Sequence, residues 1–475
     1  MNEMKKIFVS AYACEPGLGS EIGVGWHWVL EMSRYFELWV LTRESNRKSI
    51  EPWIAEHTEY AGIHFVYYDL PQWARRWKRG MRGVRIYYML WQWLSDGIVK
   101  RTMQENGIDT YHLLTYGNAM WPASKYGMKQ RFVWGPVSAG VSLPNFLTKH
   151  FSWKSRMKEV AQRWMRWLLP LNVGFRRRCE MADLILCKTD DTIACVPRKW
   201  RDKCVQMTDV AVEMREVENY QTPKRYDETK INYVAAGTLV GWRTMDVLLE
   251  SWKLCQQSTV DGRRSTDNIY HTENSSHTDD IFYTECTEHT EINLSQAINC
   301  HSDVLDNSQL SILSLKAQRP SVLNSQLLTI VGDGPERGRL ERMVDDLGLR
   351  ESVRFVGQVD METYYSYIAQ ADVVVNSCFR EGAVTVSFDS MAMGKPLICF
   401  DTGGYTHYFA PEYSRVIKGV KSRTEAVERL AQAMAELADR ESCAQMGAEA
   451  KRKSGLYDWG HKGEIIREEL RIIGL

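Results

Sequence analysis

The chain has 475 residues, of which 44% are hydrophobic, with 60 basic and 60 acidic side chains. A chain of this size can bury large cores and is expected to form two or more domains. The zero net charge argues against nucleic acid as a partner. The 11 cysteines are odd in number and lack metal-ligand spacing, which fits a reducing cytoplasm better than a disulfide framework.

The first residues, MNEMKKIFVSAYACEPG, have two interpretations. Lysines, a short apolar run and Ala-Tyr-Ala-Cys resemble a lipoprotein signal, but the run is short for a signal core and Tyr12 fits the cleavage site poorly. A first strand leading into a glycine-rich loop is the better interpretation. Because no apolar stretch approaches the roughly 20 residues that span a bilayer, we expect a soluble, cytoplasmic protein.

The first 214 residues alternate apolar strand patterns with helical patterns. A helix is predicted around residues 26–35, after the glycine-rich residues 17–25. Strands are predicted at residues 6–13, 38–42, 63–69, 110–116, 131–137 and 182–189. This alternation predicts right-handed βαβ units and a parallel sheet.

The alternation restarts after the polar residues 215–230, which are predicted to be a linker. Further strands are predicted at residues 231–237, 327–334, 353–359, 371–377 and 396–404. The predicted fold is therefore α/β, with two Rossmann-like, doubly wound domains (residues 1–214 and 231–455) facing across a cleft. Ligands bind beyond the carboxyl ends of such strands. Residues 456–475 are predicted to form a C-terminal helix that packs back on the first domain.

Residues 256–325 interrupt the second domain. They are rich in Ser, Thr, Asn, Asp and His, and they separate a helix from a strand that normally follows within a few residues. The composition predicts a disordered insert. Its histidines and cysteines lack metal-ligand spacing, so no metal site is predicted there.

The segment FREGAVTVSFDSMAMGKPLI, residues 379–398, does not have the pattern of an ordinary core helix. Glu381 follows a predicted strand, and Gly382, Ala383, Val384 and Thr385 would offer backbone N–H groups at a helix start, where anions bind. Asp389 would lie about one turn into that helix, roughly 6 Å along its axis. This arrangement suits an extended ligand with a phosphate in its middle. The alternative is a capped helix with an aspartate at the edge of the core.

Two further loops follow predicted strands. IVGDGPE (residues 330–336) contains Gly334, and AAGTLVGWRTMDVLLE (residues 235–250) contains Gly237, Thr238 and Arg243. The three loops would converge at one end of the sheet.

Together these motifs resemble the nucleotide-sugar domain of retaining glycosyltransferases of family 4, which have the GT-B fold. The family motif has Glu, seven residues and a second Glu, and here the second acid is Asp389. Thr238 stands where the family has Arg, and Arg243 where it has Lys. Residues 13–32 (ACEPGLGSEIGVGWHWVLEM) and 131–140 (RFVWGPVSAG) extend the resemblance, which covers nearly the whole chain apart from the insert.

The resemblance implies roles for these residues. Glu381 would contact the donor sugar, Asp389 the ribose, and Arg243 the diphosphate. Further donor contacts would come from Gly237, Thr238, Gly334, the amides of Gly382 to Thr385, and a turn at Gly23 and Val24. His112 would be an active-site histidine, with a satisfied core histidine as the alternative, and Ser20 and Glu21 would lie on the acceptor side. No Asp-x-Asp pair is present, so we expect no metal and no other cofactor.

Two segments combine basic and aromatic residues. Residues 72–94 hold six Lys/Arg and no acid, and residues 151–178 hold eight Lys/Arg and one Glu. Tryptophan beside Lys/Arg suits the interface of an anionic bilayer, here the cytoplasmic face of the inner membrane, with a glycan or polyprenyl-linked acceptor. The alternative is a surface helix whose arginine stems lie on apolar core.

The resemblance implies a hexosyltransferase of bacterial capsule, O-antigen or exopolysaccharide synthesis. A sugar-nucleotide epimerase of the same fold and a non-catalytic nucleotide or glycan binder remain alternatives. A NAD dehydrogenase is disfavoured because no G-x-G-x-x-G follows the first strand.

Overall fold

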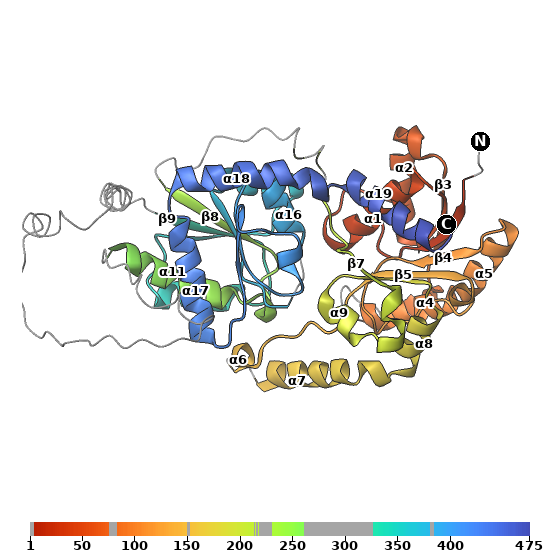
Figure 1. The fold of residues 1–475 in the computed structure, drawn as a ribbon, viewed down its shortest axis with the longest axis horizontal. Coiled ribbons are helices and arrows are strands. Elements are labelled where there is room, and N and C mark those ends of the chain that lie inside the picture. The colour runs from red at the N-terminus through yellow and green to blue at the C-terminus, as the bar shows by residue number, and fades with distance from the viewer. Residues whose placement is uncertain are drawn as a thin grey trace, which may run out of the picture. The chain divides into compact units, whose positions relative to one another are not determined.

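The structure is a computed structural model that describes residues 4–75, 83–149, 153–212, 214, 217, 230–260, 326–380 and 384–475. Most of the predicted linker 215–230 and of the predicted insert 256–325 lies outside these residues. Two parallel sheets organise the described chain (Figure 1).

The first sheet has seven strands in the order β3-β2-β1-β4-β5-β6-β7. They are β1 (Lys6–Ser10), β2 (Glu37–Arg43), β3 (Ile63–Tyr68), β4 (Thr110–Leu113), β5 (Arg131–Val137), β6 (Leu184–Cys187) and β7 (Cys204–Gln206). The helices of this part are α1 (Ser20–Ser33), α2 (Arg47–Glu56), α3 (Gln72–Arg75), α4 (Val84–Leu94), α5 (Asp96–Glu105), α6 (Asn145–Thr148), α7 (Trp153–Trp167), α8 (Val173–Met181) and α9 (Asp190–Cys195). The strand order reverses between β1 and β4, which is the doubly wound pattern.

The second sheet has six strands in the order β10-β9-β8-β11-β12-β13. They are β8 (Ile231–Ala236), β9 (Gln326–Val331), β10 (Val353–Gly357), β11 (Val373–Asn376), β12 (Leu397–Phe400) and β13 (Ser414–Ile417). The helices are α11 (Met245–Val260), α14 (Arg337–Asp346), α15 (Met361–Gln370), α16 (Thr385–Ala392), α17 (Arg423–Glu436), α18 (Arg440–Ser454) and α19 (Trp459–Ile472). The predicted fold class, α/β with two Rossmann-like parallel sheets, is confirmed.

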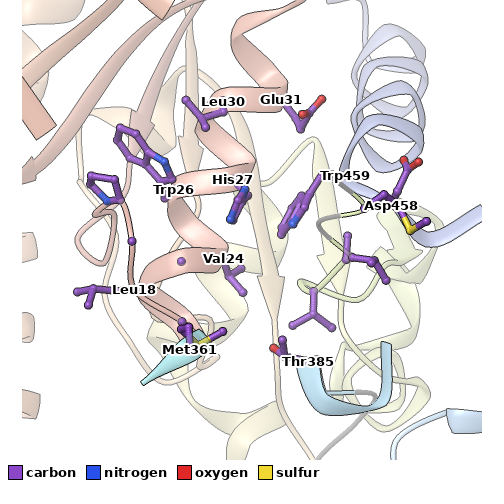
Figure 2. Close-up of a pocket in the computed structure, with 18 of the residues that line it drawn as sticks. Leu18, Val24, Trp26, His27, Leu30, Glu31, Met361, Thr385, Asp458 and Trp459 are labelled. Carbon is purple, nitrogen blue, oxygen red and sulfur yellow. The ribbon is translucent and has the colours of Figure 1, made fainter. Parts of the chain in front are cut away.

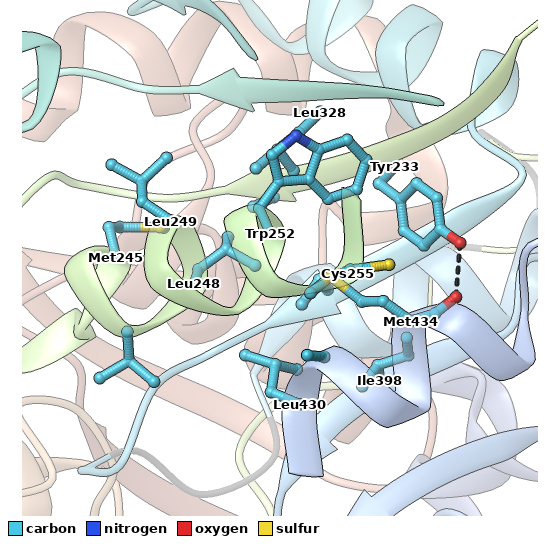
Figure 3. Packing of buried hydrophobic residues seen from close by; sticks show 14 of the residues in the cluster. Tyr233, Met245, Leu248, Leu249, Trp252, Cys255, Leu328, Ile398, Leu430 and Met434 are labelled. Carbon is cyan, nitrogen blue, oxygen red and sulfur yellow. Dashed lines mark hydrogen bonds between the residues drawn. The ribbon is translucent and has the colours of Figure 1, made fainter. Parts of the chain in front are cut away.

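Apolar side chains from helices on both faces bury each sheet. In the core beside β8, Tyr233 packs edge-on against Trp252, with ring centroids 5.1 Å apart (Figure 3). The Tyr233 hydroxyl donates to the Met434 carbonyl at 2.7 Å, so this buried polar group is satisfied. The core therefore fixes α11 and α17 against the strands that carry the site loops.

Helix α19 at the C-terminus packs beside α1 and the first sheet (Figure 1). Trp459, Ile466 and Leu470 of α19 belong to the same buried cluster as Val9 and Val29. The apolar face of α19 is thus buried on the first sheet, although the helix follows the second sheet in sequence.

The sequence analysis missed two edge strands and misplaced one helix start. β7 has only three half-buried residues, and β13 (SRVI) mixes polar and apolar side chains, so neither shows a clear apolar run. Helix α1 begins at Ser20, six residues before its predicted start. The glycines at 23 and 25 argued for a loop, but both are required by close packing: a Cβ at Gly23 would lie 2.1 Å from the Leu18 carbonyl oxygen.

Candidate functional site

Two loops at the carboxyl end of the second sheet are joined by backbone hydrogen bonds. The Gly237 amide donates to the Val331 carbonyl at 2.9 Å, and the Leu239 amide donates to the Asp333 carbonyl at 3.0 Å. The Glu336 amide donates in return to Leu239 at 3.1 Å. The loop after β8 and the loop after β9 therefore form one rigid surface.

Glycine permits this close approach. Gly237 has φ +145°, and a Cβ there would lie 2.5 Å from Nη1 of Arg243, so the guanidinium rests against the bare glycine. A Cβ at Gly334 would lie 2.4 Å from the Leu239 carbonyl oxygen. Thr238, between these contacts, is exposed. Arg243 is thereby held at the carboxyl end of the sheet, and its role at the diphosphate stays a prediction.

The loop after β11 joins the same surface. The Ser377 hydroxyl donates to the Arg243 carbonyl at 3.1 Å, and the Thr244 hydroxyl donates to the Ser377 carbonyl. All three loops that the sequence singled out are thus brought together. Glu381, Gly382 and Ala383 themselves lie outside the described residues, and their roles stay predictions.

Helix α16 begins at Thr385, with Val384 as its N-cap, as the sequence analysis expected for this segment. Asp389 is buried one turn into the helix and accepts a hydrogen bond from the Tyr364 hydroxyl of α15 at 2.7 Å. Burial and the neighbouring Asp389 carboxylate together raise the pKa of Tyr364 well above its ordinary value. The phenol therefore stays protonated and remains a donor to Asp389.

A cavity of about 900 Å³ lies beside this aspartate (Figure 2). Gly23 and Val24 of α1, Thr385 and Asp389 of α16 and Trp459 at the start of α19 all line it. Figure 2 shows Val24, Thr385 and Trp459 around the cavity. This volume falls within the range of small-molecule sites, roughly 300–1,000 Å³. Arg243, Gly237, Thr238 and Gly334 do not line this cavity.

Aromatic side chains line the part of the cavity formed by α1 and α19. The His27 ring stacks on Trp459 with centroids 5.2 Å apart (Figure 2). Burial lowers the pKa of His27 to about 4, so the imidazole is neutral at pH 7. The stacked His27 and Trp459 rings thus offer flat, uncharged surfaces to a ligand, and the acidic and basic side chains of Glu31, Arg34 and Asp458 line the same part of the cavity.

His112 lies in the core and not at the cavity. It has no exposed surface, it is paired in register with Val9 and Val133, and its Nε2 lies 2.7 Å from the Gly135 carbonyl oxygen. Burial lowers the pKa of His112 to about 4. This geometry favours the alternative of a core histidine, and a direct catalytic role for His112 stays an untested prediction.

The predicted turn at Gly23 and Val24 is wrong. Both residues lie inside α1, where an amide is bonded to the carbonyl four residues earlier, so they do not present free amides as a turn would. Ser20 is the first residue of α1. The Glu21 carboxylate of the same helix accepts from the Gly117 amide at 3.0 Å, which ties α1 to the loop after β4.

Several lining residues carried no sequence signal. The tertiary fold brings two residues of α15, Met361 and Tyr365, to the cavity. It also brings Asp458, which precedes α19, and Trp459, the first residue of α19. His27 lies on the inward face of α1, and from the sequence alone that position would fit an ordinary core residue. Within the described residues, no group of three or more His, Cys, Asp or Glu could hold a metal ion.

Comparison with known proteins identifies part of the chain. Residues 307–453 match the family "Glycosyl transferases group 1", so the chain carries a glycosyltransferase group 1 domain. The lipopolysaccharide core biosynthesis glycosyltransferase LpsD of Rhizobium meliloti is 41% identical over 71 residues, 15% of this chain and 20% of LpsD. The putative teichuronic acid biosynthesis glycosyltransferase TuaC of Bacillus subtilis is 29% identical over 120 residues, 25% of this chain and 29% of TuaC. The matches thus span less than a third of each relative.

Solved structures share the fold over nearly the whole chain. Sucrose-phosphate synthase from Thermosynechococcus elongatus superposes with a TM-score of 0.59 at 14% identity and covers 99% of both chains. Anabaena HepE in complex with UDP-glucose gives a TM-score of 0.51 at 11% identity, over 98% of this chain and 99% of HepE. At these identities the likeness establishes the GT-B type of fold.

Proposed function

We propose that this chain is a retaining glycosyltransferase of family 4, of the hexosyltransferase type. It transfers a sugar from a nucleotide-sugar donor to a glycan or polyprenyl-linked acceptor in bacterial surface polysaccharide synthesis. The observation that carries the proposal is the meeting of three loops at the carboxyl end of the second sheet. The loops after β9 and β11 lie within the matched residues 307–453, and Thr385, where the loop after β11 leads into α16, lines a cavity of about 900 Å³. The names of LpsD and TuaC support the choice of pathway, and the UDP-glucose complex of HepE supports the donor class.

The proposed chemistry depends on electrostatic stabilisation. Breaking a sugar–diphosphate bond develops negative charge on the leaving oxygen, and preorganised donors at that oxygen are usually the largest catalytic contribution. Arg243, held against Gly237, supplies a positive charge. The N-terminus of α16 at Thr385 supplies amides and the positive end of a helix dipole. These groups can act on the diphosphate without a metal ion.

The proposal assigns different roles to the two acids of the motif. Glu381 orients the sugar as the bond breaks, so Glu381→Gln is expected to lower kcat strongly. Asp389, fixed by Tyr364, contacts the ribose both before and during bond breaking, so Asp389→Asn is expected mainly to raise KM for the donor. Tyr364→Phe is the matched control: it leaves the carboxylate in place but unfixed, and it should raise KM less than Asp389→Asn does. Unchanged donor kinetics in both Asp389→Asn and Asp389→Ala would make Asp389 only a core-edge residue.

The direct test is donor turnover. UDP-, GDP- and ADP-sugars are screened by thermal shift, since a ligand at 100 times its Kd stabilises by about 2.7 kcal/mol. The stabilising donor is then incubated with and without a lipid-linked acceptor extract, and NMR of the first-formed linkage reports the anomeric configuration. Retention with acceptor-dependent turnover is expected. Inversion would remove the family 4 assignment, and a free isomerised sugar without acceptor would indicate an epimerase.

The second part of the proposal is contact with an anionic membrane at the cytoplasmic face. Among the described residues, no helix is long and apolar enough to cross a bilayer. The outer face of α7 carries Trp153, Trp164 and Trp167, which are 72%, 60% and 70% exposed. Exposed Arg156 and Lys158 lie on the same helix. Exposed tryptophans among cations suit the headgroup region of an anionic bilayer.

Residues 72–94 support membrane contact less strongly. Trp73, Ile86 and Trp93 are exposed, but Tyr88 and Trp91 of α4 are buried in the first core. Residues 76–82, with most of the basic side chains of this segment, lie outside the described residues. The proposed membrane surface is therefore centred on α7.

A further inference from the structure

Helix α7 has its polar face turned toward the protein. Among the α7 side chains that the structure describes, the buried or half-buried ones are Glu159, Gln162, Arg163 and Arg166, which are spaced i, i+3, i+4 and i+7 and so form one stripe. The apolar and aromatic side chains lie on the exposed side instead. A surface helix of a globular protein normally has the opposite arrangement. Specific polar contacts, and not apolar burial, therefore determine where α7 sits.

The contacts of this polar stripe reach the loop after β11. Nη1 of Arg380 lies 2.8 Å from a carboxylate oxygen of Glu159, and Nη2 of Arg380 donates to the side-chain oxygen of Gln162. Glu159 is only 8% exposed, so its charge is poorly screened. Two cations pair with it: Arg380 at 2.8 Å and, more distantly, Arg166 of α7 at 3.9 Å. Arg380 immediately precedes Glu381 and lies four residues before Val384, the N-cap of α16.

The chain before α7 is anchored in the same place. Leu143 and Leu147 belong to the buried core of the second sheet, and Phe146 packs edge-on against Phe379 with ring centroids 6.2 Å apart. Arg163 of α7 donates to the Leu143 carbonyl at 2.9 Å. A segment of the first half of the chain is thus locked onto residues 379 and 380, directly before the predicted donor-site loop.

We propose that α7 is a positioning element for the donor site, in which Glu159 and Gln162 hold Arg380 and thereby link the outer tryptophan face of α7 to the loop between β11 and α16. When an anionic bilayer covers that outer face, it restrains α7 further, and the Arg380 contact passes this restraint to residues 379 and 380. The enzyme is then most competent where its lipid-linked acceptor is located. The effect of the membrane on the donor site rests on the proposed function. The positioning of Arg380 by Glu159 does not depend on it.

The first test needs neither donor nor acceptor. Amide hydrogen exchange is measured by mass spectrometry on peptides that contain Arg380 and the first turn of α16. Glu159→Gln removes the charge but keeps the shape, and it should speed exchange there about tenfold, because a hydrogen bond to a charged group is involved. Arg380→Gln removes the same contact from the other side and should speed exchange by a similar factor, and the double variant Glu159→Gln with Arg380→Gln should exchange little faster than either single variant. Glu436→Gln, which breaks the surface pair with Arg415, is the matched control and should change nothing there.

The second test adds vesicles of phosphatidylglycerol and phosphatidylcholine in equal parts. In the wild type, bound vesicles should slow exchange in the Arg380 peptides, and in Glu159→Gln they should bind equally well without slowing it. Two results would overturn the link: wild-type exchange that does not change when vesicles bind, or no vesicle binding at all. Equal exchange rates in wild type and Glu159→Gln without vesicles would overturn the positioning role. A protein that fails to turn over any nucleotide-sugar would contradict the proposed function and leave these exchange results unaffected.

Discussion

Helices α7 and α19 have similar lengths, 15 and 14 residues, but use their faces in opposite ways. Helix α19 buries Trp459, Ile466 and Leu470 against the first sheet, as an amphipathic surface helix normally does. Helix α7 turns Glu159 and Gln162 inward and exposes its tryptophans. Apolar burial contributes about 25 cal/mol per Å², whereas a hydrogen bond contributes a net of about 1 kcal/mol. Burial of α19 therefore contributes to the stability of the fold, and the exposed face of α7 is the surface that we propose contacts the membrane.

The largest expected effect comes from breaking the packing of α19. Ile466 is fully buried, so Ile466→Ala removes apolar contacts and leaves a cavity, and the free energy of unfolding should fall by about 2–5 kcal/mol. Met157→Ala, on the exposed face of α7, is the matched control and should change the free energy of unfolding by less than about 0.5 kcal/mol. Urea unfolding of both variants measures the difference. Equal losses in the two variants would mean that α7 also packs through its apolar face.

The next effect concerns the outer face of α7. Replacing Trp164 and Trp167 together by Ser should weaken binding to anionic vesicles by about tenfold, roughly 1.4 kcal/mol, without lowering the stability of the protein. Flotation assays at low and high salt measure this binding, which should weaken with salt because exposed charges are screened within about 10 Å at 0.1 M. Leu456→Ser, at another exposed apolar position, is the control. Binding that does not respond to salt would contradict the electrostatic part of the proposal.

The smallest effect tests a buried cation on the inward face of α19. The Lys462 ammonium donates to the Thr208 carbonyl, and burial lowers the pKa of Lys462 to about 7. The unfolded chain keeps its lysine charged up to about pH 10.4, so it binds more protons than the folded protein from below pH 7 up to that value. Stability should therefore rise with pH in this window, by about 1 kcal/mol between pH 7 and 8.

Lys462→Met is the variant that isolates this contribution. It keeps a side chain of similar length without a charge, so the rise between pH 7 and 8 should disappear even if the absolute stability changes. Unfolding free energies at closely spaced pH values measure the slope. An unchanged slope in Lys462→Met would show that Lys462 stays charged in the folded protein, held by the nearby Asp209 carboxylate.

Much of the fold and part of the candidate site could be predicted from local sequence patterns. Apolar runs such as LLTIV and VVVN located the strands, because a strand of a parallel sheet is buried on both faces and reads as a continuous apolar segment. The order of strands and helices then placed Arg243, Thr385 and the glycine loops at the carboxyl ends of strands. The start of α16 at Thr385 followed from the same reasoning.

The face on which a side chain lies was decided by the tertiary structure. The sequence of residues 151–178 fitted both outward tryptophans and arginine stems on apolar core, since the helical period is the same in either case. The sequence shows only that Asp389 stands where the family has glutamate, whereas the structure places the Tyr364 hydroxyl against that carboxylate.

The sequence by itself determined the buried strands, the loops that follow them and the acids of the motif, because these features are recognised from residues close together along the chain. Only the tertiary structure decided that Trp459 faces His27, that His112 lies in the core and that Glu159 holds Arg380, 221 residues away. Such contacts depend on how whole helices pack against each other. A local sequence pattern does not specify how helices pack, because different polar side chains of similar size and charge can occupy the same helical position.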